Sequence, residues 1–181
     1  MSKTSSLHYD LCCLGARWLR GRKNVEHCEG RWKYVAVELC VQACENPDIW
    51  AFNGWSTIVV EVKVSRADFL NDKKKVWHQQ GLEECLAGNY RYYLTPKGLL
   101  TEADLPDGVG LLEWDGKVSS RTVRARRRTV SNHADGIIMA SLLRREHFPE
   151  GIYNYRGCPT TIKSKTVTLK DAMEMPDTTR L

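Results

Sequence analysis

Hydrophobic and β-branched residues flank an Asn-Gly pair in the stretch 49–60, which reads Ile-Trp-Ala-Phe before Asn53-Gly54 and ends in Thr-Ile-Val-Val. An Asn-Gly pair between two such segments is a strong short-range signal for a β-hairpin. If Asn53 and Gly54 form a two-residue loop, counting back along both strands pairs Asp48 with Val59. The pattern therefore predicts a hairpin together with its register.

Strand side chains alternate between two faces, so this register predicts which residues lie together. Asp48, Glu61 and Lys63 share one face, and the Cβ atoms of Asp48 and Glu61 are diagonal neighbours roughly 7 Å apart. Two carboxylates at such a spacing can share a divalent cation. In the alternative interpretation, Asp48 caps a turn while Glu61 and Lys63 form an ordinary surface ion pair. The opposite face is wholly apolar, as a core face should be: Ile49, Ala51, Ile58, Val60 and Val62.

Helical and alternating periods predict the elements around this hairpin. Apolar residues at helical spacing predict an amphipathic helix over residues 7–19, and a β-rich stretch predicts a strand over 34–41 that contains Glu38. Ser65 and Asp68 have the spacing of a capping box, which predicts a helix from there to about Leu86. The rest of the pattern predicts strands over 90–94, 110–114 and 118–123 and a helix over 132–145.

The predicted order of helix, three strands, helix and strand indicates an α/β fold with a mixed central sheet flanked by helices, an αβββαβ core. Residues 1–147 form the predicted domain. Between residues 148 and 181, Pro, Gly, Thr and Lys dominate without a clear period. We therefore expect an irregular C-terminal extension.

The 181-residue chain is long enough for one domain with a substantial core. No stretch approaches the roughly 20 apolar residues that span a bilayer, and the N-terminus lacks a signal-peptide pattern, so we expect a cytoplasmic protein with no membrane contact. The seven cysteines show no Cys-x-x-Cys spacing, which indicates free thiols in a reducing compartment. His8 near Cys12, and His27 beside Cys28, could in principle bind a metal, although neither spacing requires one.

The net charge of +5 is moderate but unevenly distributed. A run of arginines is usually a solvated face, and near a phosphodiesterase site it can also contact phosphate. Both interpretations apply to the cluster formed by Arg121, Arg124, Arg126, Arg127 and Arg128.

Pro47-Asp48, followed by Glu61 and then Lys63, resembles the active-site signature of the PD-(D/E)XK nuclease superfamily, which has the restriction-endonuclease-like fold. A longer set of residues, spread over roughly 32–145, resembles the MmcB-type DNA-repair proteins within that superfamily. This set comprises Glu38-Leu39, Asp48-Ile49-Trp50-Ala51, Val60-Glu61-Val62-Lys63, Ser65-Arg66-Ala67-Asp68-Phe69, Asp72-Lys73-Lys74, Leu105-Pro106, Gly110-Leu111-Leu112 and Ala125-Arg126-Arg127-Arg128.

The resemblance implies a metal site and an assignment of roles. Asp48 and Glu61 would bind Mg²⁺, or Mn²⁺ in its place, with the main-chain carbonyl of Val62 as a further ligand. Lys63 would orient or deprotonate the attacking water, and Glu38 would be an auxiliary acidic residue near the metal. For contact with nucleic acid we expect Arg66, Lys73, Arg121, Arg124, Arg126, Arg127 and Arg128.

The resemblance implies a divalent-metal-dependent deoxyribonuclease that acts in DNA repair, recombination or mobile-element biology. Exonucleases of the superfamily often place a Gln and a Tyr four residues apart on the helix after the Lys. Here Gln79 and Gln80 are followed by Glu83 and Glu84, which favours an endonuclease or a structure-specific nuclease.

Two other functions remain open: a DNA-binding module of the same fold that does not cut, and a nuclease that acts on RNA. The expected partner is duplex, branched or single-stranded DNA, which implies association with the nucleoid. Many enzymes of this fold cut two strands as homodimers. Near the hairpin tip, Trp50, Phe52 and Trp55 either stack on unpaired bases or pack in the interior.

Overall fold

The computed structural model describes residues 3–21, 32–41, 45–72, 86–116, 123–129 and 132–145. All of these belong to one compact unit, Met1–Glu146. The predicted C-terminal extension lies outside the described residues. The same is true of Lys73, Arg121, the His27-Cys28 pair and the two glutamines and two glutamates at 79–84.

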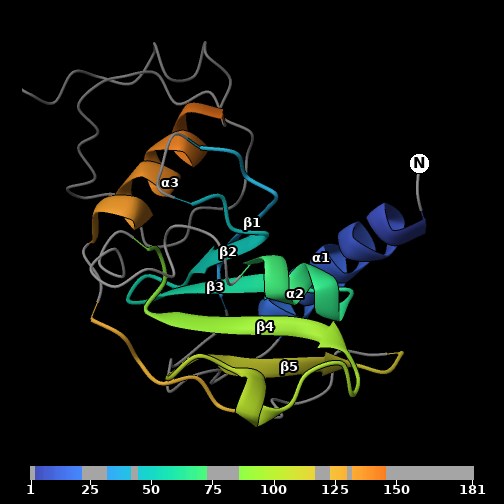
Figure 1. Ribbon diagram of the computed structural model, residues 1–181. Coiled ribbons are helices and arrows are strands. Elements are labelled where there is room, and N and C mark those ends of the chain that lie inside the picture. The colour runs from blue at the N-terminus through green and yellow to red at the C-terminus, as the bar shows by residue number, and fades with distance from the viewer. Residues whose placement is uncertain are drawn as a thin grey trace, which may run out of the picture. The chain divides into compact units, whose positions relative to one another are not determined.

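The element order confirms the αβββαβ core, to which one more strand and a closing helix are added (Figure 1). A short 3₁₀ helix, η4, covers Glu102–Asp104. The other elements are α1 (Lys3–Gly21), β1 (Tyr34–Val37), β2 (Ile49–Phe52), β3 (Thr57–Val62), α2 (Arg66–Asp72), β4 (Tyr90–Pro96), β5 (Gly110–Trp114) and α3 (Asn132–Arg145).

The strands form one five-stranded mixed sheet in the order β1-β2-β3-β4-β5. The three strands β1, β2 and β3 form an antiparallel meander. Strands β4 and β5 run parallel to β3, so their carboxyl ends meet at one end of the sheet. We call this the carboxyl end of β3; it is the end that Lys63 follows.

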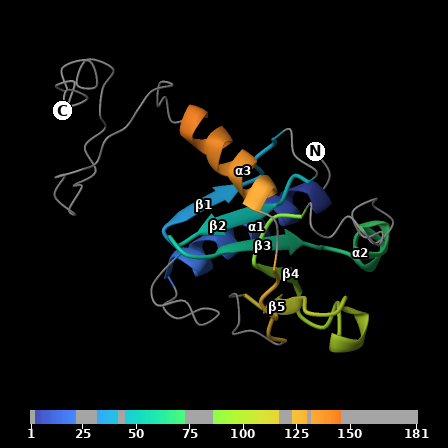
Figure 2. The same cartoon turned by 90° about the vertical axis from the view of Figure 1, so that its left-hand side faces the viewer.

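Helices α1 and α3 cover opposite faces of the sheet (Figures 1 and 2). Apolar side chains of α1, among them Leu11, pack on Ile49 and Ile58, which point to one face. Trp50 and Val59 alternate to the other face. There they pack against α3. The predicted division of the hairpin into two faces is therefore confirmed.

Asp135 of α3 fixes the second face by hydrogen bonds. Its carboxylate accepts the Trp50 indole N–H at 2.7 Å, the Thr57 hydroxyl at 2.9 Å and the Gly88 backbone N–H at 3.2 Å. A buried carboxylate is tolerated here because these three hydrogen-bond donors satisfy its oxygen atoms. The aromatic side chain of Trp50 is thus a packing residue, fully buried.

The predicted hairpin register is wrong by two residues. Phe52 pairs with Thr57 instead of Trp55, because Asn53 does not act as a simple corner residue. Its side-chain oxygen accepts the backbone N–H groups of Trp55 and Ser56 at 2.8 Å, which closes an Asx-type turn inside a four-residue loop. A shift of two residues preserves the faces, since side chains alternate with a period of two.

The predicted strand over 34–41 is too long. It ends at Val37, and Glu38 adopts the left-handed region with φ of 46°, so Glu38 follows the strand instead of lying inside it. The Glu38 N–H still bonds to the Asp48 carbonyl at 2.8 Å, which keeps the two strand ends together.

The start of α2 agrees with the predicted capping. The Ser65 hydroxyl accepts the Asp68 backbone N–H at 3.1 Å, and the Asp68 carboxylate reaches back to the Val64 N–H at 3.4 Å. The predicted continuation to Leu86 covers residues 73–85, which lie outside the described part of the chain. Of the strand predicted over 118–123, only Val123 is described, and it forms an isolated bridge with Leu111.

Candidate metal-binding site

The observed register brings the two predicted metal ligands closer than expected. The last β2–β3 pair is Ile49 with Val60. One further step along both strands places Asp48 opposite Glu61, where the predicted register made them diagonal. Directly opposed residues have Cβ atoms about 4.5–5.5 Å apart. The two acids therefore lie at the carboxyl end of β3, where β2 and β3 begin to separate.

The carboxylate of Asp48 closes this end of the hairpin. Its Oδ2 accepts the Val62 backbone N–H at 2.7 Å and lies 3.3 Å from Nε2 of His8 on α1. The side chain remains 20% exposed. The Val62 peptide, predicted to offer its carbonyl to the metal, is therefore held at the site through its N–H.

Lys63 lies beside Glu61 and is almost completely buried. Its Nζ is 3.3 Å from Glu61 Oε2 and 3.3 Å from Asp72 Oδ1. Burial by itself would lower the pKa of Lys63, but Glu61, Asp72 and Asp48 outweigh it and raise the pKa. The amine is therefore a protonated cation at neutral pH.

Glu61 lies in a buried environment that contains charges of both signs. Burial, reinforced by the charge of Asp48, raises its pKa to about 7, although Lys63 and Arg91 act in the opposite direction. The carboxyl group is only 12% exposed, and Arg91 lies 3.8 Å from its Oε1. A bound cation would relieve this repulsion between Asp48 and Glu61.

A buried ion pair between Arg91 and Glu45, which the sequence did not indicate, lies next to Glu61. Arg91 of β4 donates to both carboxylate oxygens of Glu45, at 2.7 and 2.9 Å, and Glu45 also accepts the Ala87 N–H at 2.7 Å. Burial opposes the charge of Arg91, but Glu45 more than compensates and raises its pKa. The one available signal was an arginine within an otherwise apolar strand; Glu45 has no comparable signal.

Asp72, like Arg91 and Glu45, had no role assigned from the sequence. It is 4% exposed, at the end of α2, and pairs with Lys63. The Tyr93 hydroxyl also donates to its Oδ2 at 3.4 Å. Asp72 and Glu61 thus hold Lys63 from two sides. A family-like Asp-Lys-Lys run marked its position but not this contact.

Helix α1 brings His8 to this end of the sheet. His8 Nδ1 lies 3.5 Å from Glu38 Oε1, while its Nε2 faces Asp48. The hydrogen bond with Asp48 raises the pKa of His8 against the effect of burial. Glu38, predicted as an auxiliary acid, is therefore on the α1 side of Asp48, where it pairs with His8.

Of the predicted nucleic-acid contacts, those that the structure describes are Arg66 and the arginines of the segment 124–128, and the latter do not lie near these acids. Arg66 forms a two-pronged ion pair with Asp104 at 2.6 and 3.2 Å, which ties α2 to η4. The segment 124–128 lies at the opposite end of the sheet, where the Arg128 N–H bonds to the Asn89 carbonyl beside the start of β4 (Figure 1). Asn89 is level with Thr57, six residues and about 20 Å of strand before Lys63.

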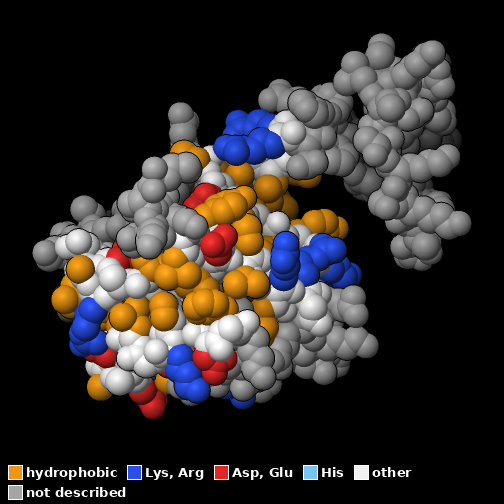
Figure 3. Space-filling model, turned by 90° about the vertical axis from the view of Figure 1, so that its right-hand side faces the viewer, with side chains coloured by type: hydrophobic (Ala, Val, Ile, Leu, Met, Phe, Trp, Pro, Cys, Tyr) orange, Lys and Arg blue, Asp and Glu red, His pale blue; other side chains and the backbone are white. Residues whose placement is uncertain are grey.

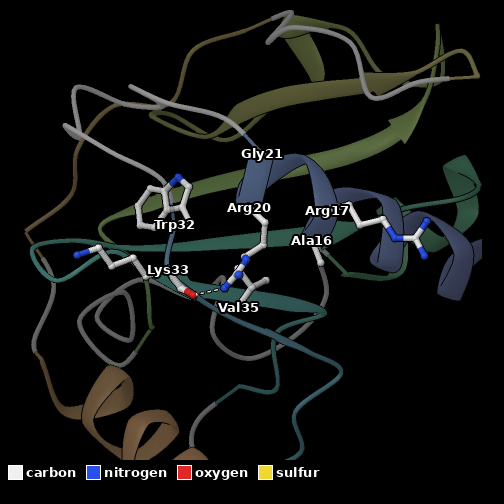
Figure 4. A pocket seen from close by; sticks show the side chains of 7 residues that line it. All are labelled: Ala16, Arg17, Arg20, Gly21, Trp32, Lys33 and Val35. Atoms are coloured by element: carbon white, nitrogen blue, oxygen red, sulfur yellow. Dashed lines mark hydrogen bonds between the residues drawn. The ribbon is translucent and has the colours of Figure 1, made fainter. Parts of the chain in front are cut away.

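The surface at the carboxyl end of β3 is seen in Figure 3, which views the molecule from the side toward which β4 points. Acidic side chains there are set among hydrophobic ones. A separate hollow of about 830 Å³ lies between the last turn of α1 and the chain leading into β1 (Figure 4). Its charged lining residues are Arg17, Arg20 and Lys33, so it suits an anion and not a metal ion.

Trp55 is the aromatic residue that remains available for stacking. It is 88% exposed at the hairpin tip, so the interpretation of it as a packing residue is wrong. Phe52 is half-buried between Tyr34 and Trp50, with ring centroids 6.2 and 6.3 Å away.

None of the helices in the described parts of the chain combines the length and the apolar character that a membrane span needs.

Comparison with protein-family models and with curated proteins finds no match. Among solved structures the chain is similar to the SPO1766 protein of unknown function from Silicibacter pomeroyi, with a TM-score of 0.46 and 22% identity. That similarity covers 61% of this chain and 72% of the other. The function is therefore argued from the residues of the site alone.

Proposed function

We propose that this protein is a divalent-metal-dependent nuclease that hydrolyses phosphodiester bonds in DNA, as an endonuclease or structure-specific nuclease. The observation that carries the proposal is the Asp48 carboxylate at the end of the β2–β3 pairing, 2.7 Å from the Val62 N–H, with Lys63 Nζ 3.3 Å from Glu61; continuing the register by one step puts Asp48 opposite Glu61. Two carboxylates and one amine at the open end of a hairpin form the donor set that such hydrolysis requires.

The donor set fits Mg²⁺. Asp48, Glu61 and the carbonyl of Val62 offer only oxygen ligands, which this hard cation prefers. Burial, together with the charge of Asp48, raises the pKa of Glu61, and a bound cation would favour its ionised form. When bound, Mg²⁺ or Mn²⁺ polarises a phosphoryl oxygen and lowers the pKa of coordinated water.

The protein's own groups would then position the reactants. Because Lys63 is held protonated by Glu61 and Asp72, we assign it to orienting water and stabilising negative charge on the phosphate, and not to removing a proton. Arg91 of the adjacent strand β4, held by Glu45, lies 3.8 Å from the Glu61 carboxylate and so helps to position it. These roles account for the two buried ion pairs next to Glu61, which are Lys63 with Asp72 and Arg91 with Glu45.

The test is cleavage of labelled duplex, single-stranded and branched DNA with Mg²⁺, with Mn²⁺ and with EDTA. We expect metal-dependent cutting that is lost in Asp48→Asn, Glu61→Gln and Lys63→Met. Asp107→Asn is the matched control. Asp107 is 85% exposed and lies at the opposite end of the sheet, next to Gly108, whose carbonyl accepts the Arg126 N–H. Binding without metal-dependent cutting would instead identify a non-cleaving DNA-binding module, and cutting only of matched RNA would identify a ribonuclease.

A DNA substrate implies a nucleoid-associated protein in the cytoplasm, and cleavage of both strands implies a homodimer. Both follow from the proposed activity. Sedimentation of the protein with and without a duplex measures the second directly: one protein chain per cleaved duplex would contradict the dimer.

A further inference from the structure

Three metal-ligating side chains converge on the α1 side of Asp48. His8 and Cys12 are one helical turn apart on α1 and so lie on one face of that helix. Glu38 reaches the same point from the end of β1. One ligand atom from each residue lies within 4.8 Å of the other two. This trio contains nitrogen, sulfur and oxygen donors, unlike the all-oxygen set formed by Asp48 and Glu61.

Two of the three separations are close to the edges of a tetrahedron around a transition-metal ion, and the third is within 4.8 Å. His8 Nδ1 lies 3.7 Å from Cys12 Sγ and 3.5 Å from Glu38 Oε1. With metal–ligand distances of about 2.0–2.3 Å, tetrahedral coordination places ligand atoms about 3.4–3.6 Å apart. The side chains therefore need only small adjustments to bind one ion.

The second ring nitrogen of His8 has the partner that metal-bound histidines usually have. Its Nε2 faces Asp48 Oδ2 at 3.3 Å, while Nδ1 faces the other two donors. A carboxylate on the far nitrogen fixes the tautomer, so that Nδ1 presents its lone pair, and increases the basicity of the ring.

The backbone at Glu38 gives a further indication. Among the described residues, Glu38 is the single non-glycine residue with a positive φ, at 46°. This conformation is strained for a residue that has a Cβ atom and persists where the surroundings enforce it. Here it turns the Glu38 carboxylate toward His8 at the point where β1 ends.

We propose that His8, Cys12 and Glu38 form a second metal site, for a borderline-soft transition-metal ion of the Zn²⁺ class. Its three ligands differ from those of the Asp48–Glu61 site, although Asp48 contacts His8 and so lies between the two sites. The proposal does not rest on the proposed nuclease activity. Three protein ligands leave a fourth position for water, and Glu38, with its side chain 46% exposed, gives the ion access from solvent. Cys12 must lose its proton on binding, because burial and Asp48 raise its pKa far above the usual range.

The experiment is titration of the full-length, metal-free, reduced protein with Co²⁺, followed by displacement with Zn²⁺. We expect visible d–d bands of a tetrahedral site and a near-ultraviolet thiolate-to-cobalt band, both at one equivalent. Cys12→Ser should abolish the thiolate band, and His8→Gln and Glu38→Gln should each weaken binding at least tenfold. Cys13→Ser is the matched control and should leave the spectrum unchanged.

Two comparisons keep the outcome decisive. Glu38→Gln alters an exposed side chain, so its effect does not depend on folding of a core variant, and circular dichroism checks the fold of Cys12→Ser. Glu61→Gln should abolish cleavage and retain the thiolate band, which separates failure of this site from failure of the nuclease. A thiolate band that survives Cys12→Ser, or no band at all in the wild-type protein, would overturn the proposal and leave His8 as an ion-pair partner of Asp48 and Glu38.

Discussion

Asp48 accepts the backbone N–H of Val62 through its side chain, at 2.7 Å, at the point where β2 and β3 separate. The carboxylate therefore has two separable functions. It supplies negative charge to the candidate metal site, and it satisfies a donor that the end of the hairpin would otherwise leave without a strand partner. Substitutions that keep one of these functions and remove the other distinguish the two.

We expect Asp48→Asn to lose metal binding while keeping nearly wild-type stability, since an amide oxygen can still accept the Val62 N–H. Asp48→Ala removes the acceptor as well and should cost about 1–3 kcal/mol. Urea unfolding in EDTA measures the free energies, and a Mg²⁺-induced shift of the midpoint measures binding. Equal stability of the two variants would show that the hydrogen bond contributes nothing.

The pH dependence of stability should report the crowding at Glu61. Its folded-state pKa of about 7 lies above the ordinary 4.5, so the folded protein binds this proton more tightly than the unfolded chain does. Stability is therefore greatest from this group below about pH 4.5 and is lost as the pH rises through 7. The loss is on the order of 3 kcal/mol at most.

Glu61→Gln should flatten this loss in EDTA, and the variant should exceed the wild-type melting temperature at pH 8. The control Glu102→Gln alters an exposed side chain and should change neither the pH-dependent loss of stability nor the melting temperature at pH 8. Mg²⁺ added at pH 8 should stabilise the wild type and not Glu61→Gln, because only the ionised site binds the cation. Thermal melts across pH 4–8 measure both effects; parallel curves for wild type and Glu61→Gln would contradict the assignment.

Much of the fold follows from local signals, and the particular residues show why. The bounds of β5 and α3 agree with the predicted 110–114 and 132–145; for β5 the turn residues Asp115-Gly116 mark the end of the strand. The faces of the hairpin were also predictable, since alternation survives an error of two residues. The register itself was not, because it depends on whether Asn53 uses its side chain to close the loop.

The surroundings of the candidate site were largely beyond reach of the sequence. Glu45 and Arg91 are 46 residues apart, and no local pattern pairs them. His8 and Asp48 meet because α1 packs on one face of the sheet and its N-terminal half lies beside the start of β2. Conversely, the arginine run looked like a neighbour of the acids, yet parallel pairing of β3 and β4 sends it to the far end of the strands.

The buried pair of Arg91 and Glu45 should be costly to break. Arg91→Met leaves Glu45 as a buried charge without its counter-ion, for which we expect about 3–5 kcal/mol of destabilisation. Arg126→Met is the control, because the Arg126–Asp107 pair is exposed and should contribute at most about 1 kcal/mol. The double variant Arg91→Met with Glu45→Gln should recover part of the loss; strict additivity in urea unfolding would show that the two side chains are not coupled.

The position of the arginine segment makes its contribution to DNA binding dependent on substrate length. About 20 Å of strand separates Thr57, level with Asn89 and Arg128, from Lys63. At 3.4 Å per nucleotide of duplex, one DNA molecule must exceed about six base pairs to contact both ends of the sheet. The segment can therefore strengthen binding of long duplexes without taking part in the chemistry.

We expect Arg124→Gln with Arg127→Gln to weaken binding of a 20-base-pair duplex regardless of its sequence. The slope of log affinity against log salt should fall by about 0.9 for each phosphate that the protein no longer neutralises. A hairpin with a stem of about six base pairs should bind both proteins equally, and the metal dependence of cleavage should not change. Arg66→Gln, which removes a side chain already paired with Asp104, is the matched control and should leave the slope as it is. An unchanged slope on the long duplex would exclude the arginine segment from the DNA-binding surface.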